Sequence, residues 1–112
     1  MLITSLLLAT MAPAGTGTVD TTRAAFTKCL RGHLKKSLEA KMGEAEYEVS
    51  LKGACDTERE AFRAAVTAAN AASGYSAADA ADNAEMQIED YHASFTDKFA
   101  DYSASKTMPV DE

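Results

Sequence analysis

Apolar residues recur along this chain with helical spacing in three successive segments. In the first segment, residues 21–42, an apolar residue returns at every fourth position and so marks one helix face. Asp20 is the expected N-cap of this helix, and Gly43 is expected to end it. The residues of this stripe are Phe26, Leu30, Leu34 and Leu38.

The second segment, residues 44–72, has an apolar stripe that passes through Gly53. We expect one continuous helix, because a glycine in a helix interior costs only about 1 kcal/mol. The alternative is a break near Gly53, since Thr57-Glu-Arg-Glu60 has the spacing of a capping box and would start a further helix. The stripe consists of Tyr47, Leu51, Cys55, Phe62, Val66 and Ala69.

The third segment begins at Ser76-Ala-Ala-Asp79, which resembles a capping box with Asp in place of Glu. Its apolar residues alternate between spacings of three and four, which is typical of an amphipathic helix. After residue 102 this periodicity stops, and we expect a disordered tail over 103–112. The apolar residues are Ala84, Ile88, Tyr91, Phe95, Phe99 and Tyr102.

These segments predict an all-α fold with one helical domain over 15–102. A chain of 112 residues has room for one domain, and abundant Ala with few β-branched residues favours helix over sheet. We expect a three-helix up-down-up bundle. The alternative is an elongated helical hairpin with a third helix, which would leave apolar surface exposed for a partner or a second copy.

The first fourteen residues have the pattern of a secretory signal peptide. They are uncharged and apolar and end in Ala12-Pro13-Ala14, but no Lys or Arg precedes the apolar run. The run is too short to span a bilayer, which takes about 20 residues. We therefore expect an exported protein, periplasmic or secreted, with no transmembrane segment in the mature chain. The alternative is an N-terminal helix of a cytosolic protein.

Charge is distributed unevenly along the chain. The net charge is −6, with +4 over residues 19–42, −3 over 44–72 and −7 over 75–112. An acidic chain is a poor candidate for nucleic-acid binding. The basic residues of the first segment could meet anionic lipid or an acidic partner, but we expect them to face the acidic third segment of their own chain. They are Lys28, Arg31, Lys35 and Lys36.

The two cysteines, Cys29 and Cys55, predict a disulfide between the first two helices. Their midpoint is residue 42, beside the turn predicted at Met42-Gly43, and residues equidistant from a hairpin turn lie opposite each other. Exported compartments are oxidising and form such bonds. Redox catalysis is not indicated, because the cysteines are far apart in sequence and both are predicted to lie within helices.

The chain offers one weak candidate for a metal site and no catalytic constellation. Glu89 and His92 form a Glu-x-x-His pair, with Glu85 one turn earlier on the same side. The only other histidine, His33, lacks a Glu three positions before it, so we interpret the pair as part of a solvated acidic face. We expect no metal and no other cofactor. No nucleophile with a matching base is visible.

Three short motifs resemble a group of uncharacterised small exported helical bacterial proteins that have a signal peptide and one widely spaced cysteine pair. The resemblance covers most of the mature chain and implies the compartment and the disulfide. It implies no activity and supplies no site residues. The motifs are Phe26-x-x-Cys29-Leu30, Cys55-x-x-Glu58 and Ala80-Ala81-x-x-Ala84-Glu85-x-Gln87-Ile88-x-Asp90-Tyr91.

The leading hypothesis for function is therefore a non-enzymatic binding or structural protein of the cell envelope that acts through a helical surface. Its partner would be another protein or a second copy of the chain. The alternative is a carrier of a metal or small ligand that uses Glu85, Glu89 and His92 on the acidic third helix. An enzyme is the least favoured class, because no acid–base pair can be named.

Overall fold

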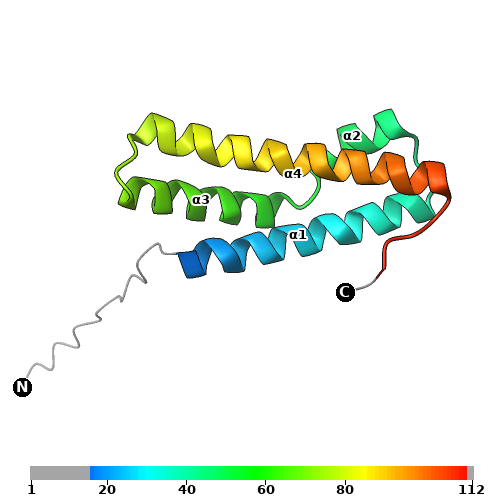
Figure 1. Cartoon of the computed structure of the whole chain (residues 1–112), viewed down its shortest axis with the longest axis horizontal. Coiled ribbons are helices and arrows are strands. Elements are labelled where there is room, and N and C mark those ends of the chain that lie inside the picture. The colour runs from blue at the N-terminus through cyan, green and yellow to red at the C-terminus, as the bar shows by residue number, and fades with distance from the viewer. Residues whose placement is uncertain (1–15, 111–112) are drawn as a thin grey trace, which may run out of the picture.

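The computed structural model describes residues 16–110 and folds them into four helices without a strand (Figure 1). The predicted signal peptide, residues 1–14, lies outside the described residues. Along the chain, α1 runs in one direction, α2 and α3 return, and α4 runs beside α1 again (Figure 1). The helices are α1 (Thr16–Glu39), α2 (Glu44–Gly53), α3 (Asp56–Ala72) and α4 (Ala77–Ser105).

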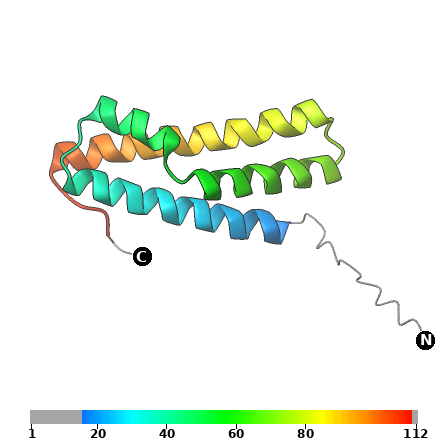
Figure 2. The same ribbon diagram turned by 180° about the vertical axis from the view of Figure 1, so that it is seen from behind.

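The all-α prediction and the up-down-up course are confirmed, but the expected three-helix count is wrong. The returning segment is broken after Gly53, as in the alternative interpretation of the sequence. Ala54 has an extended backbone and Cys55 a left-handed one, with φ of 59°, before α3 starts at Asp56. Viewed from behind, α2 and α3 follow one another along the pair of long helices and occupy its two ends (Figure 2).

Arg59 stabilises the break in a way that the capping-box pattern did not predict. Its side chain is only 13% exposed and donates from Nη1 to the backbone oxygen of Lys52, at 2.7 Å. The other guanidinium nitrogen pairs with Asp56 in the first turn of α3. One side chain therefore satisfies a carbonyl at the end of α2 and an acidic residue at the start of α3, whereas Thr57 lies inside the helix.

The helix ends show which of the predicted caps form in the structure. Ser76 caps α4 as predicted, accepting a hydrogen bond from the Asp79 amide at 3.1 Å. Asp20, the predicted cap of the first helix, lies inside α1 and pairs with Arg23 at 3.0 Å. The first helix also ends early, at Glu39, and Gly43 becomes the N-cap of α2.

A single apolar core runs between the helices. Phe26 of α1 and Phe62 of α3 stack with ring centroids 5.7 Å apart, and Tyr91 of α4 meets both rings edge-on at 5.8 Å. The apolar stripes of the sequence supply this core, because one face of each helix points inward. Its largest fully buried side chains are Phe26, Leu30, Leu34, Tyr47, Leu51, Phe62, Ile88 and Phe99.

The carboxyl-terminal end of the chain extends the last helix. α4 continues to Ser105, and so includes the first residues of the tail predicted over 103–112. Its 29 residues make a rod about 43 Å long at 1.5 Å per residue. Among residues 16–110, no helix combines the length and the hydrophobicity needed to cross a bilayer.

Candidate functional site

The Cys29–Cys55 disulfide is confirmed and joins α1 to the junction of α2 and α3. The Cα atoms are 5.9 Å apart, and the chain turns between the cysteines at residues 40–43. The sequence placed the bond between two mid-helix positions, but Cys55 is the N-cap residue of α3. The bond therefore ties α1 to the point at which the returning segment changes direction.

The disulfide also makes the two cysteines unsuitable as metal ligands. Within residues 16–110, one group of three ligand-type side chains gathers within 4.8 Å: Cys29, Cys55 and Glu58. Both sulfurs of that group are bonded to each other, and thiolates rather than disulfide sulfurs are metal ligands. The group is a structural link in the oxidised protein.

The predicted acidic candidates on α4 are not gathered into one site. Arg63 of α3 forms an ion pair with Glu85 and so draws that carboxylate toward α3. Glu89 and His92 line a shallow pocket of about 370 Å³, together with Glu48 of α2. His92 Nε2 is buried without a hydrogen-bond partner among the described residues.

The environment of His92 favours the neutral ring. Burial is the main cause of its lowered pKa, followed by the positive charges of Arg59 and Lys52, while Glu89 acts in the opposite direction. The ring also meets Phe26 edge-on, with centroids 6.2 Å apart. His92 therefore packs as a half-buried neutral side chain at the edge of the core.

A stack of three rings crosses the other half of the bundle. Tyr47 of α2 lies between His33 of α1, at 5.6 Å, and Phe99 of α4, at 4.1 Å. Burial raises the pKa of Tyr47 to about 12, and its hydroxyl has no hydrogen-bond partner among the described residues. His33 Nε2 and Ser50 Oγ are hydrogen-bonded at 3.0 Å.

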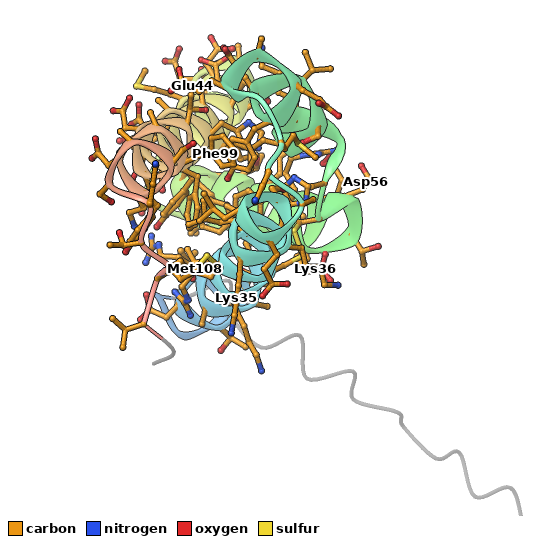
Figure 3. The ribbon with its side chains drawn as sticks, turned by 90° about the vertical axis from the view of Figure 1, so that its right-hand side faces the viewer. Lys35, Lys36, Glu44, Asp56, Phe99 and Met108 are labelled. Atoms are coloured by element: carbon orange, nitrogen blue, oxygen red, sulfur yellow. A yellow bond between two sulfur atoms is a disulfide. The ribbon has the colours of Figure 1, made fainter. Side chains whose placement is uncertain are left out.

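The same end of the bundle contains a pocket of about 550 Å³, which we call the end pocket. It lies where α1 and α4 finish, and the chain beyond α4 passes beside α1 there, with Met108 on that side (Figure 3). Phe99, the last ring of the stack, is one of its walls. Its apolar walls are Leu38, Met42, Phe99, Tyr102 and Met108, and its polar walls are Lys41, Ser103, Lys106 and Thr107.

Sequence reasoning did not find the end pocket, because its walls come from two segments far apart in the chain, residues 38–42 and 99–108. Lys41 and Lys106 each follow a helix and each have a left-handed backbone, with φ of 54° and 56°. The available signal was weak. Met42 and Met108 are apolar residues outside the helices, and apolar residues beyond a helix end must pack on something or remain exposed.

Several charged residues of α1 and α4 are exposed. Lys28, Arg31 and Lys36 of α1 are among them, and within residues 16–110 none of the three forms an ion pair with α4. An ion pair that does join neighbouring helices, Arg63–Glu85, comes from α3 instead. We call the exposed residues Lys28 and Arg31 of α1 the basic stripe, and the exposed residues Asp90, Asp97 and Asp101 of α4 the acidic stripe.

Comparisons with known proteins leave the fold and these surfaces as the basis for inference. No protein-family model, no curated protein and no solved structure matches this chain. The resemblance to small exported helical proteins therefore stays a prediction. Function has to be argued from the disulfide, the end pocket and the two charged stripes.

Proposed function

We propose that this chain is a non-enzymatic structural or binding protein of an exported compartment, and that it assembles with copies of itself through its charged helical surfaces. The basic stripe of one copy would bind the acidic stripe of the next. The observation that carries the proposal is the outward orientation of both stripes. Side chains of opposite charge that face away from each other in one molecule are complementary between molecules.

The spacing of the stripes supports this pairing. Lys28 and Arg31 are three residues apart on α1, and Asp97 and Asp101 are four residues apart on α4. Three or four residues advance a helix by about one turn, so each pair stays on one face. Met86, 57% exposed one turn before Asp90, adds an apolar contact to the acidic side.

The compartment is part of the proposal. A disulfide that ties two parts of the core is typical of proteins exported to the periplasm or secreted. The expectation of a signal peptide over residues 1–14 agrees with that location. Intact mass spectrometry of the protein exported by its native host checks both points, because cleavage shortens the chain and the disulfide removes two protons.

Assembly through these stripes should depend strongly on salt. The chain's net charge of −6 repels another copy at long range, whereas the stripes attract at contact. Sedimentation velocity should show species above monomer mass at about 0.05 M salt. They should dissociate at about 0.5 M, because the screening length falls from above 10 Å to below 5 Å. A strict monomer under both conditions would contradict the proposal.

Charge exchange gives the sharpest test. Lys28→Glu/Arg31→Glu and, separately, Asp90→Lys/Asp97→Lys should each reduce self-association. A mixture of the two variants should associate again, because each now supplies the surface that the other lost. The control Lys52→Glu/Lys98→Glu changes the net charge as much as the first variant but lies outside the stripes, and it should associate nearly as the parent does.

One outcome would redirect the interpretation. If the mixture stays monomeric while the parent protein floats with vesicles of anionic lipid, the basic stripe binds a membrane and self-assembly is excluded. Neutral vesicles are the control in that measurement, because attraction of exposed lysines to anionic lipid is electrostatic.

A further inference from the structure

We propose that the end pocket binds an anionic amphiphile, a molecule with one acidic headgroup and one alkyl chain. The proposal is independent of self-assembly, because the pocket shares no residue with either charged stripe. It rests on the shape and chemistry of the pocket walls and on the backbone conformation of its two lysines.

The apolar walls are suited to an alkyl chain. Phe99 is almost fully buried and forms a rigid base, because it is stacked on Tyr47. Met42 and Met108 stand at the margin, and Met108 is 43% exposed. Methionine side chains adapt to ligands of irregular shape. The volume of about 550 Å³ is in the range of about 300–1,000 Å³ typical of small-molecule sites.

The polar walls are suited to an acidic headgroup. Lys41 and Lys106 both line the pocket, with the hydroxyl groups of Ser103 and Thr107, and no Asp or Glu is among the walls that residues 16–110 supply. The chain as a whole has 17 acidic and 11 basic residues, so two lysines without a carboxylate among the described walls differ from the chain's average composition. Ammonium groups and hydroxyls donate hydrogen bonds to a carboxylate or a phosphate.

The backbone at these two lysines is the strongest argument. Met42 donates to Ser37 O and Thr107 to Tyr102 O, each at 3.1 Å, and so closes the helix end around a left-handed residue. At the end of α3, which is away from the pocket, Gly74 takes the equivalent position with φ of 98°.

Glycine is the residue that this position favours, because a side chain there adds steric strain. Both helix ends at the pocket use Lys instead. Residues that contradict a local preference are concentrated at functional sites, so we infer that the two lysines are retained for their charge.

The helix dipoles are the main objection to this site. Helix C-termini carry partial negative charge, which opposes an anion and attracts the lysines themselves. At α1, however, Ala40, Lys41 and Met42 donate to three of the exposed carbonyls. At α4, Lys106 and Thr107 both donate to the carbonyl of Tyr102. Each lysine also carries a full positive charge, which exceeds the partial negative charge of one helix end.

Titration calorimetry with three probes of equal chain length tests the proposal. Sodium dodecanoate and dodecyl phosphate, both below the concentration at which they form micelles, should bind one molecule per chain, and dodecanol should bind much more weakly. Comparison of the two anionic probes shows whether the headgroup preferred is a carboxylate or a phosphate. Equal affinity for dodecanol and dodecanoate would overturn the proposal, as would no binding of either anion.

Substitution of the lysines by glycine separates binding from stability. Lys41→Gly/Lys106→Gly should weaken dodecanoate by about tenfold or more, the usual effect of losing charge-assisted hydrogen bonds. The melting temperature of the free protein should stay the same or rise, because glycine relieves the left-handed strain. The control Lys52→Gln, on an exposed residue of α2, should bind as the parent does.

Two measurements distinguish ligand binding by the lysines from a role in the helix ends alone. If the glycine variant binds dodecanoate as tightly as the parent, the lysines serve the helix ends alone and the proposal fails. Met108→Ser supplies the second measurement. It should weaken dodecanoate, because Met108 is one of the apolar walls of the pocket, and unchanged affinity would also contradict the site.

Discussion

The two halves of the bundle share the same long helices but differ in what packs between them. In the half that contains α3, this helix contacts both α1 and α4, and the core is the aromatic cluster of Phe26, Phe62 and Tyr91. Polar side chains there meet each other at the margin, as Asn70 and Asn83 do at 2.9 Å.

The half that contains α2 is packed less completely. This helix lies mainly against α4, and its core includes the unpartnered hydroxyl of Tyr47 and the half-buried ring of His33. It also opens into the end pocket. We therefore expect the α3 half to supply most of the stability, whereas the α2 half contains the space and the two lysines of the end pocket. The Cys29–Cys55 bond lies where the halves meet.

The largest effect should come from the core of the α3 half. Phe62→Ala removes a fully buried ring that stacks on Phe26, and it should cost about 3–5 kcal/mol in the free energy of unfolding. Met108→Ala, at the wall of the end pocket, should change it by no more than about 0.5 kcal/mol. Urea denaturation measures both. Equal losses would show that the halves do not differ.

Removal of the disulfide should cost nearly as much. Opening a loop with a sequence separation of 26 residues lowers stability by about 3.5 kcal/mol on the loop-entropy model. Cys29→Ala/Cys55→Ala in urea denaturation measures this loss. Cys29→Ala/Cys55→Gly should be about 1 kcal/mol more stable, because glycine tolerates the left-handed backbone at position 55. A loss below about 1 kcal/mol in the first variant would contradict the role of the bond.

Tyr47→Phe should have the opposite sign. A buried hydroxyl without a partner costs about 1–3 kcal/mol, so its removal should stabilise the protein by about 1 kcal/mol while keeping the stack on Phe99. Tyr91→Phe, at a half-buried position in the α3 half, is the control and should be near neutral. If Tyr47→Phe destabilises the protein, the hydroxyl makes a stabilising contact and the α2 half is better packed than proposed.

The smallest effect is a dependence of stability on pH. Burial lowers the pKa of both His33 and His92 below the ordinary value of 6.5, with the charge of Lys36 adding to the effect at His33. Below about pH 6.5 the unfolded chain therefore binds more protons than the folded one. The contribution of the two neutral histidines to the free energy of unfolding is fully present above that pH. It is lost as the pH falls through the lowered pKa values.

Denaturation at about pH 7.5 and about pH 5.5 measures this dependence, which should be small because both rings are only half buried. His33→Gln/His92→Gln should flatten the difference between the two conditions. If the difference in stability between the two pH values is unchanged in this variant, carboxylates cause it and the histidines do not.

Much of the helical architecture could be read from local patterns. The stripe from Phe26 to Leu38 and the one from Ile88 to Tyr102 predicted the two long helices, because helical spacing alone decides which residues share a face. Ser76 predicted the start of α4 for the same local reason. The cysteine pair was predicted because symmetry about one turn is also a property of the sequence.

The sequence prediction preferred a continuous helix to a break at Gly53, because it considered helix propensity and not tertiary contacts. A continuous helix is locally acceptable, but Arg59 stabilises the break and Cys55 is held by its bond to α1. Lys28 and Arg31 form no ion pair with α4 within residues 16–110, since net charge along a chain does not say which helix faces oppose each other.

The sequence by itself therefore determined the two long helices and the cysteine pair, which depend on spacing over a few turns or on one symmetric hairpin. Only the tertiary structure decided that Lys41 and Lys106 would line one pocket and that the charged stripes would face outward. Those features join residues far apart in the chain. Their position depends on how the helices pack against each other, which no local pattern encodes.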